Sequence, residues 1–416
     1  MSYRHRGNRD LIQRINRNLV LNLIKSQEPI SRTQIARLSG LGLATVSGIT
    51  ARLIEIGLAH EIGEGESSGG RRPVLLGLNR QAGFVVGVKL MEHAVTSALT
   101  DLDAQVLHHC ITPVERPQGE WRPDDVVCTL IQAVETTIAE AGVDRQRVLG
   151  IGIGMAGLVD SESGICSYSP IFGWRDVPLA EPITRHLGLP AYLENDVNTL
   201  AIAEQWFGHG RGVDHFVVIT VGRGIGAGIV INGQFYRGAV GGAGEFGHIT
   251  LTEGGPPCDC GKQGCLEALA SDQAMVRQAR EAVALGERTV LAEAGTLTLE
   301  TIVEAAEAGD GLARRLLADS GRWLGMGVSM IVNLLNPQLI IVGGEGVQAG
   351  EYRFGPMRAA IRDHTFNGLA DDLQVVIELS GDETWARGAA SLVLQQIYRS
   401  PIHGEVSEVN LGMTTT

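Results

Sequence analysis

A histidine and three cysteines lie close together in a chain that holds six cysteines among 416 residues. His248, Cys258, Cys260 and Cys265 follow the spacing H-x9-C-x-C-x4-C. Three thiolates and one imidazole form the closed tetrahedral set of a structural zinc site, which leaves no position open for a reactive water. The alternative, a group of free surface thiols, would leave reactive cysteines on one loop. The spacing therefore predicts a structural Zn²⁺ ion.

Acids and a carboxamide form a second group of candidate functional residues. Asn195 and Asp196 stand where an apolar stretch gives way to a helical pattern, while Glu245, His248 and Glu267 flank or precede the cysteines. Together they offer several hydrogen-bond acceptors and a few donors, the mixture that sugar hydroxyls require. Asp196 alone would be explained as a helix cap, and Glu245 alone as a solvated loop acid. Only the combination predicts a sugar site.

Glycines form a third feature, in the segment "VGRGIGAGI". Backbone amides at such turns are free to bind anions, and Gly222, Gly224, Gly226 and Gly228 have a suitable spacing. Tight bends in a sheet would produce the same pattern. The glycines alone leave both interpretations open.

Alternating strands and helices must position these residues. After Asn79 the pattern predicts antiparallel strands near 84–90, 94–102 and 105–111, a helix over 124–141 and a buried strand that ends in a glycine turn near 157. A second round of the same kind begins near 215, and a helix over 385–398 ends it. Two similar α/β halves imply a cleft between two lobes.

The first 80 residues have a different character. They hold 12 Lys and Arg against 6 Asp and Glu, whereas the whole chain has a net charge of −13. Apolar spacing predicts a long helix over 10–26, a short one capped by Ser31, a turn at Gly40 and a second helix over 43–56. Two short strands around a polar loop follow. This arrangement is typical of a winged helix-turn-helix that binds DNA, although a basic protein-interaction domain would share some of it.

Small side chains on the second helix would allow it to enter a major groove, and arginines on the wing would reach phosphates or a minor groove. The candidate DNA contacts are Thr33, Gln34, Ala44, Thr45, Ser47, Gly48, Thr50, Arg52, Arg71 and Arg72. No long apolar run and no secretory signal is evident, so we expect a cytoplasmic protein without membrane spans.

Several motifs together resemble the ROK family of sugar kinases and sugar-responsive repressors. They are "GGAGEFGHITL", "CDCGKQGCLEA", "ENDVN", "VGRGIGAGI" and "LLNPQLIIVGG", and the likeness covers about residues 80–400. The resemblance implies a two-lobed actin-like (ribonuclease H-like) fold of the ATPase type, in which Asn195, Asp196, Glu245, His248 and Glu267 contact the sugar. His248 would serve zinc and sugar together, and Asp196 would be the general base in a kinase. A DNA-binding head before that body is similar to the repressor branch.

The chain departs from the kinase pattern at two loops. Lys89 stands where kinases of the family place an acid that helps to hold magnesium, and bulky residues follow it in "LMEH". Arg223 stands where kinases usually have a threonine; it would bind a phosphorylated sugar or pair with a neighbouring acid. Phosphoryl transfer depends on placed metal and donors, so we expect sugar binding without efficient catalysis.

The sequence thus predicts a sugar-responsive transcriptional regulator, a repressor, that binds double-stranded operator DNA and a sugar or phosphosugar and forms a homodimer or higher oligomer. The alternatives are a sugar kinase with an appended DNA-binding domain and a body that senses a protein partner. We expect the DNA-binding domain at 1–80, a first lobe at 81–195 completed by a helix at 385–400, a second lobe with the zinc site at 196–384, and a flexible tail at 401–416.

Overall fold

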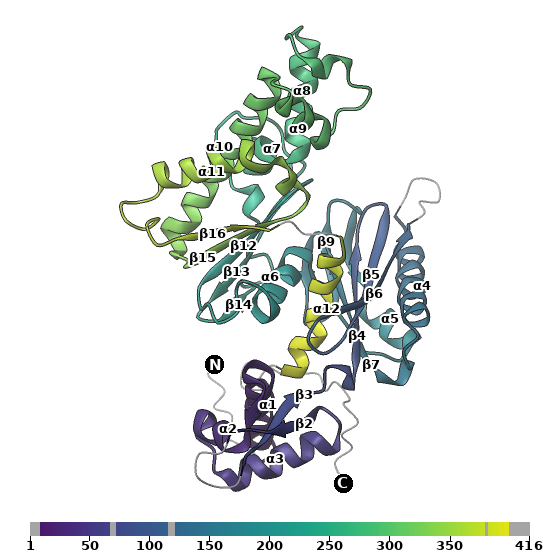
Figure 1. The fold of residues 1–416 in the computed structure, drawn as a ribbon. Coiled ribbons are helices and arrows are strands. Elements are labelled where there is room, and N and C mark those ends of the chain that lie inside the picture. The colour runs from purple at the N-terminus through teal and green to yellow at the C-terminus, as the bar shows by residue number, and fades with distance from the viewer. Residues whose placement is uncertain (1–8, 67–71, 115–120, 379–381, 399–416) are drawn as a thin grey trace.

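The computed structural model describes residues 9–66, 72–114, 121–378 and 382–398. They form a small head followed by two α/β lobes, with lobe one between the head and lobe two (Figure 1). The expected tail at 401–416 lies outside the described residues. Among the helices described, none combines the length and apolarity that a membrane crossing requires.

The head contains three helices and a three-stranded sheet. Its helices are α1 (Arg9–Gln27), α2 (Arg32–Ser39) and α3 (Leu43–Glu55), and its strands pair antiparallel in the order β1 (Ile30–Ser31), β3 (Val74–Leu78) and β2 (Ala59–Glu64). Ser31 begins α2 through a capping box, because its hydroxyl accepts from the Gln34 amide while the Gln34 side chain accepts from the Ser31 amide. Gly40 ends the helix at φ +71°, a conformation that favours glycine.

The two lobes share one sheet topology, as the repeated sequence pattern predicts. Lobe one has the order β11 (Ala191–Asn195), β7 (Val148–Met155), β4 (Phe84–Leu90), β5 (Ala94–Thr100) and β6 (Val106–Pro113). Lobe two has the order β16 (Gln374–Ile377), β15 (Leu339–Gly343), β12 (Phe216–Val221), β13 (Ile225–Ile231) and β14 (Gln234–Tyr236). In each sheet three consecutive antiparallel strands are followed by two parallel ones. The actin-like fold is therefore confirmed.

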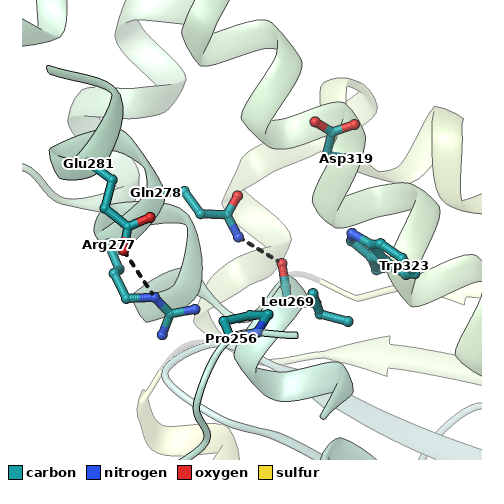
Figure 2. Close-up of a pocket in the computed structure, with 7 residues that line it drawn as sticks. All are labelled: Pro256, Leu269, Arg277, Gln278, Glu281, Asp319 and Trp323. Carbon is teal, nitrogen blue, oxygen red and sulfur yellow. Dashed lines mark hydrogen bonds and ion pairs between the residues drawn. The ribbon is translucent and has the colours of Figure 1, made fainter. Parts of the chain in front are cut away.

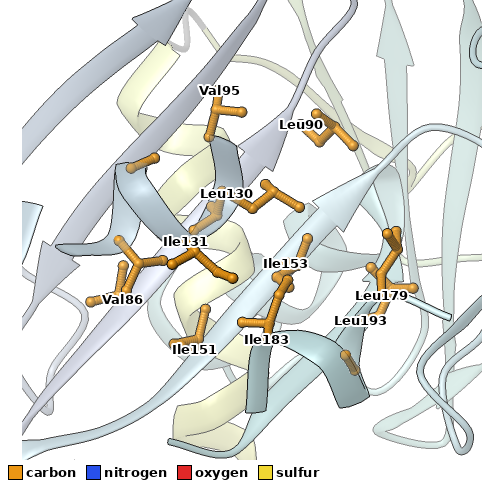
Figure 3. Close-up of a cluster of buried hydrophobic side chains, with 14 of the residues drawn as sticks. Val86, Leu90, Val95, Leu130, Ile131, Ile151, Ile153, Leu179, Ile183 and Leu193 are labelled. Atoms are coloured by element: carbon orange, nitrogen blue, oxygen red, sulfur yellow. The ribbon is translucent and has the colours of Figure 1, made fainter. Parts of the chain in front are cut away.

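Helices cover the sheets, and a small sheet extends lobe one. Lobe one carries α4 (Pro123–Ala141), α5 (Ala180–Leu187) and the antiparallel strands β8 (Leu158–Asp160), β9 (Ile165–Ser169) and β10 (Trp174–Pro178). Lobe two carries α7 (Leu266–Ala270), α8 (Asp272–Ala284), α9 (Leu299–Glu307), α10 (Gly311–Leu335) and α11 (Gly350–His364). The core of lobe one joins Leu130 and Ile131 of α4 to Ile151 and Ile153 of β7 (Figure 3).

Two helices lie where the lobes meet. Helix α6 (Asp196–Phe207) follows the last strand of lobe one, and α12 (Asp382–Tyr398) returns from lobe two and packs on β4 and β7 (Figure 1). Gly87 and Gly152 permit this packing, because a methyl group on either would collide with the backbone carbonyl of Ala386 or Ala389. The far end of α12 shares a buried apolar cluster with the head, so head and lobe one have a continuous core.

Candidate functional site

The four predicted metal ligands lie together in lobe two. His248 ends a short 3₁₀ turn, the cysteines follow on the next loop, and Cys265 immediately precedes α7. One ligand atom from each of His248, Cys258, Cys260 and Cys265 can be chosen so that all lie within 4.8 Å of one another. The Sγ atoms of Cys260 and Cys265 are 3.7 Å apart, close to the ~3.8 Å edge of a tetrahedron with zinc–sulfur bonds of about 2.3 Å. The residues therefore fit a tetrahedral metal.

Asp196 lies at the start of α6 and has a cation beside it. It is the first residue of α6 and is only 9% exposed. The Lys89 ammonium group, equally buried on β4, forms an ion pair with the Asp196 carboxylate. The Lys89 Nζ atom also lies 4.3 Å from the ring centroid of Trp385 on α12. Lys89 is thus held between a carboxylate and an aromatic ring.

Asn195 is the N-cap of α6, and Asp196 shares one of its donors, since its Oδ1 atom also accepts from the Val197 amide at 2.9 Å. The Oδ1 atom of Asn195 accepts from the amides of Val197 and Asn198, at 2.9 and 3.3 Å, and its Nδ2 group donates to the carbonyl of Gly157. These bonds hold the start of α6 against lobe one and leave one Nδ2 hydrogen without a bond among the described contacts. The capping role that the sequence left open for Asp196 therefore belongs mainly to its neighbour.

His248 joins the other two predicted sugar residues to the metal ligands. Its Nδ1 atom lies 3.5 Å from the Cys258 sulfur and its Nε2 atom lies 3.8 Å from the Glu245 carboxylate. Glu267 on α7 lies 4.0 Å from the same ring and accepts from the Ile225 amide. The pKa of Glu245 is raised above its ordinary value, chiefly by burial; the carboxylates of Glu267 and Asp196 act in the same direction and His248 opposes them. These acids therefore share one negative region.

Two ion pairs among the described residues connect the lobes, and the sequence named the acidic partner in neither. Arg223, in the glycine turn of lobe two, pairs with Glu92 at the β4–β5 turn of lobe one. Arg237 pairs with Glu194 through Nε and Oε2 at 2.8 Å, and Ser161 donates to the same carboxylate oxygen. Arg223 thus has the acidic neighbour that the sequence offered as one of two alternatives. Glu194 is a charged residue at the end of an apolar strand. This feature of the sequence indicates that the side chain has a partner of opposite charge in the fold.

Of the predicted DNA contacts that the structure describes, all but Ser47 and Thr50 are exposed. Thr33, Gln34, Ala44, Thr45, Gly48, Arg52 and Arg72 are exposed, Ser47 is half-buried, and Arg71 lies outside the described residues. The prediction that Thr50 is on the outer face is wrong, because its side chain is fully buried and accepts from Arg32 Nε. Thr50 follows buried Val46 by four residues and precedes buried Leu53 by three, which places it on the inner face of α3.

A hollow of about 470 Å³ lies elsewhere, on the helical side of lobe two. Trp323 and Asp319 of α10 face Arg277, Gln278 and Glu281 of α8 across it (Figure 2). None of the predicted sugar residues lines this hollow. The predicted sugar residues thus lie apart from this hollow, where Glu245 has His248, Glu267 and Asp196 as electrostatic neighbours.

Known proteins resemble the chain along nearly its full length. The chain is 32% identical over 398 residues to the xylose repressor of Caldicellulosiruptor bescii, covering 95% of this chain and 99% of the relative. It is 33% identical over 392 residues to the DNA-binding transcriptional dual regulator NagC of Escherichia coli K12, covering 93% and 94%.

Solved structures extend the likeness to the fold. A ROK family transcriptional regulator, described as a homologue of the E. coli MLC protein, matches with a TM-score of 0.83 and 34% identity, covering 94% of this chain and 97% of the other. A ROK family glucokinase from Streptomyces griseus, in complex with glucose and AMPPNP, matches with a TM-score of 0.65 and 32% identity, covering 74% and 99%. The model of the ROK family matches residues 85–396. The chain therefore belongs to the ROK family.

Proposed function

We propose that this ROK protein is a sugar-responsive transcriptional repressor that binds operator DNA through its head and an effector sugar between its lobes. The Lys89–Asp196 ion pair supports the proposal most strongly, because it places a cation where phosphoryl transfer would need a metal-binding acid. The full-length likeness to repressors agrees with it.

The body acts as a sensor and not as a kinase. A general base must take a proton from the attacking hydroxyl, and an ammonium group bound to Asp196 competes for the same carboxylate. The bulky side chains of Leu90 and Met91 follow Lys89 where kinases have small residues. The alternative function, a sugar kinase, is based on the presence of Asp196 and the glycine turn. An assay of magnesium-dependent ATP consumption with a panel of sugars distinguishes a kinase from a sensor.

The proposed sugar site consists of Asn195, Asp196, Glu245, His248 and Glu267. Their acceptors suit hydroxyl donors, and the His248 Nε2 atom on the side of Glu245 supplies a donor when Nδ1 binds a metal. A Zn²⁺ ion held by His248 and the three cysteines would fix that tautomer and the ring orientation. The ion would also tie the loop that carries Glu245 to α7, which carries Glu267. Its role is structural.

The head is the proposed DNA-binding module. Helix α3 presents Ala44, Thr45, Gly48 and Arg52 outward after a tight turn at Gly40, and Arg72 is exposed near the start of β3. Such a helix fits a major groove, while a basic wing reaches the backbone or the minor groove. Operator DNA lies in the cytoplasm of a bacterial cell, so the regulator would act there.

Lys25 links the head to the two helices between the lobes. It lies on α1 with 7% of its side chain exposed, and its Nζ atom is 4.2 Å from the ring centroid of Phe207 on α6 and 5.2 Å from that of Tyr398 on α12. Asn22, one turn earlier on α1, donates to the Tyr398 carbonyl at 2.8 Å. Closure of the lobes around a sugar moves α6 relative to α12, so these contacts would transmit the movement to the head.

A homodimer would make that movement matter for DNA binding. Two recognition helices must match half-sites spaced by the helical repeat of DNA, so a changed angle between heads weakens binding.

The apolar side chains of Met330, Leu334 and Phe366 are exposed at the end of α10 and just after α11. We assign this face to the second copy. Sedimentation of Leu334→Glu, beside wild type, tests it, since a monomeric variant is expected.

The direct test of the function is to select DNA from a random pool with the full chain and then add sugars to the complex. Release or tightening by one sugar, without ATP, is expected. Selection of no DNA would contradict the regulator, and rapid ATP-dependent sugar phosphorylation would favour the kinase.

A further inference from the structure

The charges around the interlobe site restrict which sugars it can accept. Among the described residues, three cations of the site are each paired with a carboxylate: Lys89 with Asp196, Arg223 with Glu92, and Arg237 with Glu194. A fourth, Lys262, is exposed and donates to the backbone carbonyl of His248. An ion pair between these groups leaves no net charge to attract an anion. The three paired cations are thus already neutralised within the described residues.

Further carboxylates give the site a net negative charge. Glu245 and Glu267 face His248, and no Lys or Arg pairs with either in the described part of the chain. Glu345 lies against Gly222, since a methyl group added at that glycine would meet its carboxylate, and Glu267 lies against Gly224 in the same way. Within the described residues the site therefore holds six carboxylates against four cations, which leaves it a net negative charge.

The glycine turn also offers little to a phosphate. The Gly222 amide donates to the Gly224 carbonyl at 3.1 Å and the Ile225 amide donates to Glu267 at 2.9 Å. These amides would otherwise be the donors that bind an anion at such a turn. With these two amides occupied and two carboxylates beside the turn, a dianionic phosphate would meet repulsion and fewer donors.

Resting on the proposed function, we infer that the effector is an uncharged sugar and that the site rejects sugar phosphates. The acids suit hydroxyl groups, because each carboxylate accepts their protons without needing a charged ligand. Glu92 is a specificity-determining residue in this arrangement. It neutralises Arg223, the cation best placed in the glycine turn to bind a phosphate.

Matched ligands test the inference on the full-length, zinc-loaded protein. Glucose, xylose and N-acetylglucosamine are each compared with their terminal phosphate esters by thermal shift and calorimetry at constant ionic strength. The expected result is that at least one free sugar binds and that its phosphate ester binds at least tenfold more weakly. Tighter binding of a phosphate ester would overturn the inference and leave a sugar-responsive regulator intact. No binding by either class would overturn the proposed function as well.

A charge-neutral substitution tests the part assigned to Glu92. In Glu92→Gln, the freed Arg223 should strengthen binding of the phosphate ester about tenfold, while the free sugar binds as before. Glu181→Gln is the matched control, because Glu181 pairs with Arg185 at 3.4 Å on the surface of α5. If folded Glu92→Gln protein shows the same ratio of affinities for the free sugar and its phosphate ester as wild type, Glu92 does not determine this specificity. The wild-type comparison decides the inference even where that variant does not fold.

Discussion

Lys89 and Asp196, 107 positions apart in the chain, form a buried ion pair between β4 and the first residue of α6. Both charges are nearly excluded from solvent, and the Lys89 ammonium group also lies over the ring of Trp385. A lysine cannot ligate magnesium, and its ammonium group occupies a carboxylate oxygen of Asp196. Under the proposed function, this pair lets the body bind a sugar without transferring a phosphate.

Removing the lysine should destabilise the body. Lys89→Met leaves the Asp196 carboxylate buried without its cation, which costs about 3 kcal/mol of folding free energy. The double variant Lys89→Met/Asp196→Asn removes both charges and should recover much of the loss. Urea unfolding followed by tryptophan fluorescence measures both. Equal stability of wild type and the single variant would show that the pair contributes nothing.

Loss of one thiolate should remove the metal. Cys260→Ser is expected to reduce bound zinc from about one ion per chain to none, because a closed site needs all four ligands. Stability of the body and the response to sugar should fall together. Cys128→Ser, at an exposed cysteine outside the cluster, is the control. Zinc loss with an intact sugar response would contradict the role assigned to His248.

Neutralising Lys25 should uncouple the head from the lobes. Lys25→Met keeps an apolar stem against Phe207 and Tyr398 but loses the cation–π contacts and the ion pair with Asp103. Sugar affinity and DNA affinity measured separately should stay within about twofold of wild type. The effect of sugar on DNA binding, expected to be fivefold or more in wild type, should fall below about twofold. Arg288→Met, at an exposed position of lobe two, should leave the effect intact.

The region between the lobes should respond to pH through Glu204 on α6. Burial, with the neighbouring Glu378 carboxylate, raises the pKa of Glu204 from an ordinary 4.5 to about 7. The folded protein therefore holds this proton more tightly than the unfolded chain. The resulting stability is fully present below about pH 4.5 and is lost as the pH rises through 7.

Glu204→Gln removes this dependence. Between pH 5 and pH 8 wild type should lose about 2 kcal/mol of unfolding free energy relative to the variant. Chemical unfolding at the two pH values measures the difference, with the surface variant Glu181→Gln as control. If the difference in unfolding free energy between wild type and Glu204→Gln is the same at both pH values, the raised pKa of Glu204 is contradicted.

Local chemistry made much of the fold predictable. Ser31 and Gln34 are three residues apart and form their capping box within one turn, and Gly40 needs only its own backbone freedom to end α2. The four metal ligands lie within 18 consecutive residues, so their spacing alone indicates the cluster. The repeated order of strands reveals the two lobes in the same way.

Long-range pairing was not predictable in this way. No local pattern joins Lys89 to Asp196 or Glu92 to Arg223, because the fold brings together segments more than 100 residues apart. A lysine inside the apolar strand "FVVGVKL" does signal a buried partner, though it does not name one. Thr50 was misplaced for a different reason: its polar side chain suggested an outer position, whereas its helical spacing from Val46 and Leu53 places it inward.

The affinity of the full chain for its selected DNA, with and without a saturating free sugar and in the absence of ATP, tests the account most directly. Fluorescence anisotropy of a labelled fragment gives this affinity. A sugar-responsive repressor should change its affinity for this DNA about fivefold or more on adding the sugar, and the sugar should be recovered unphosphorylated. An affinity that stays the same at saturating sugar would contradict the proposed function.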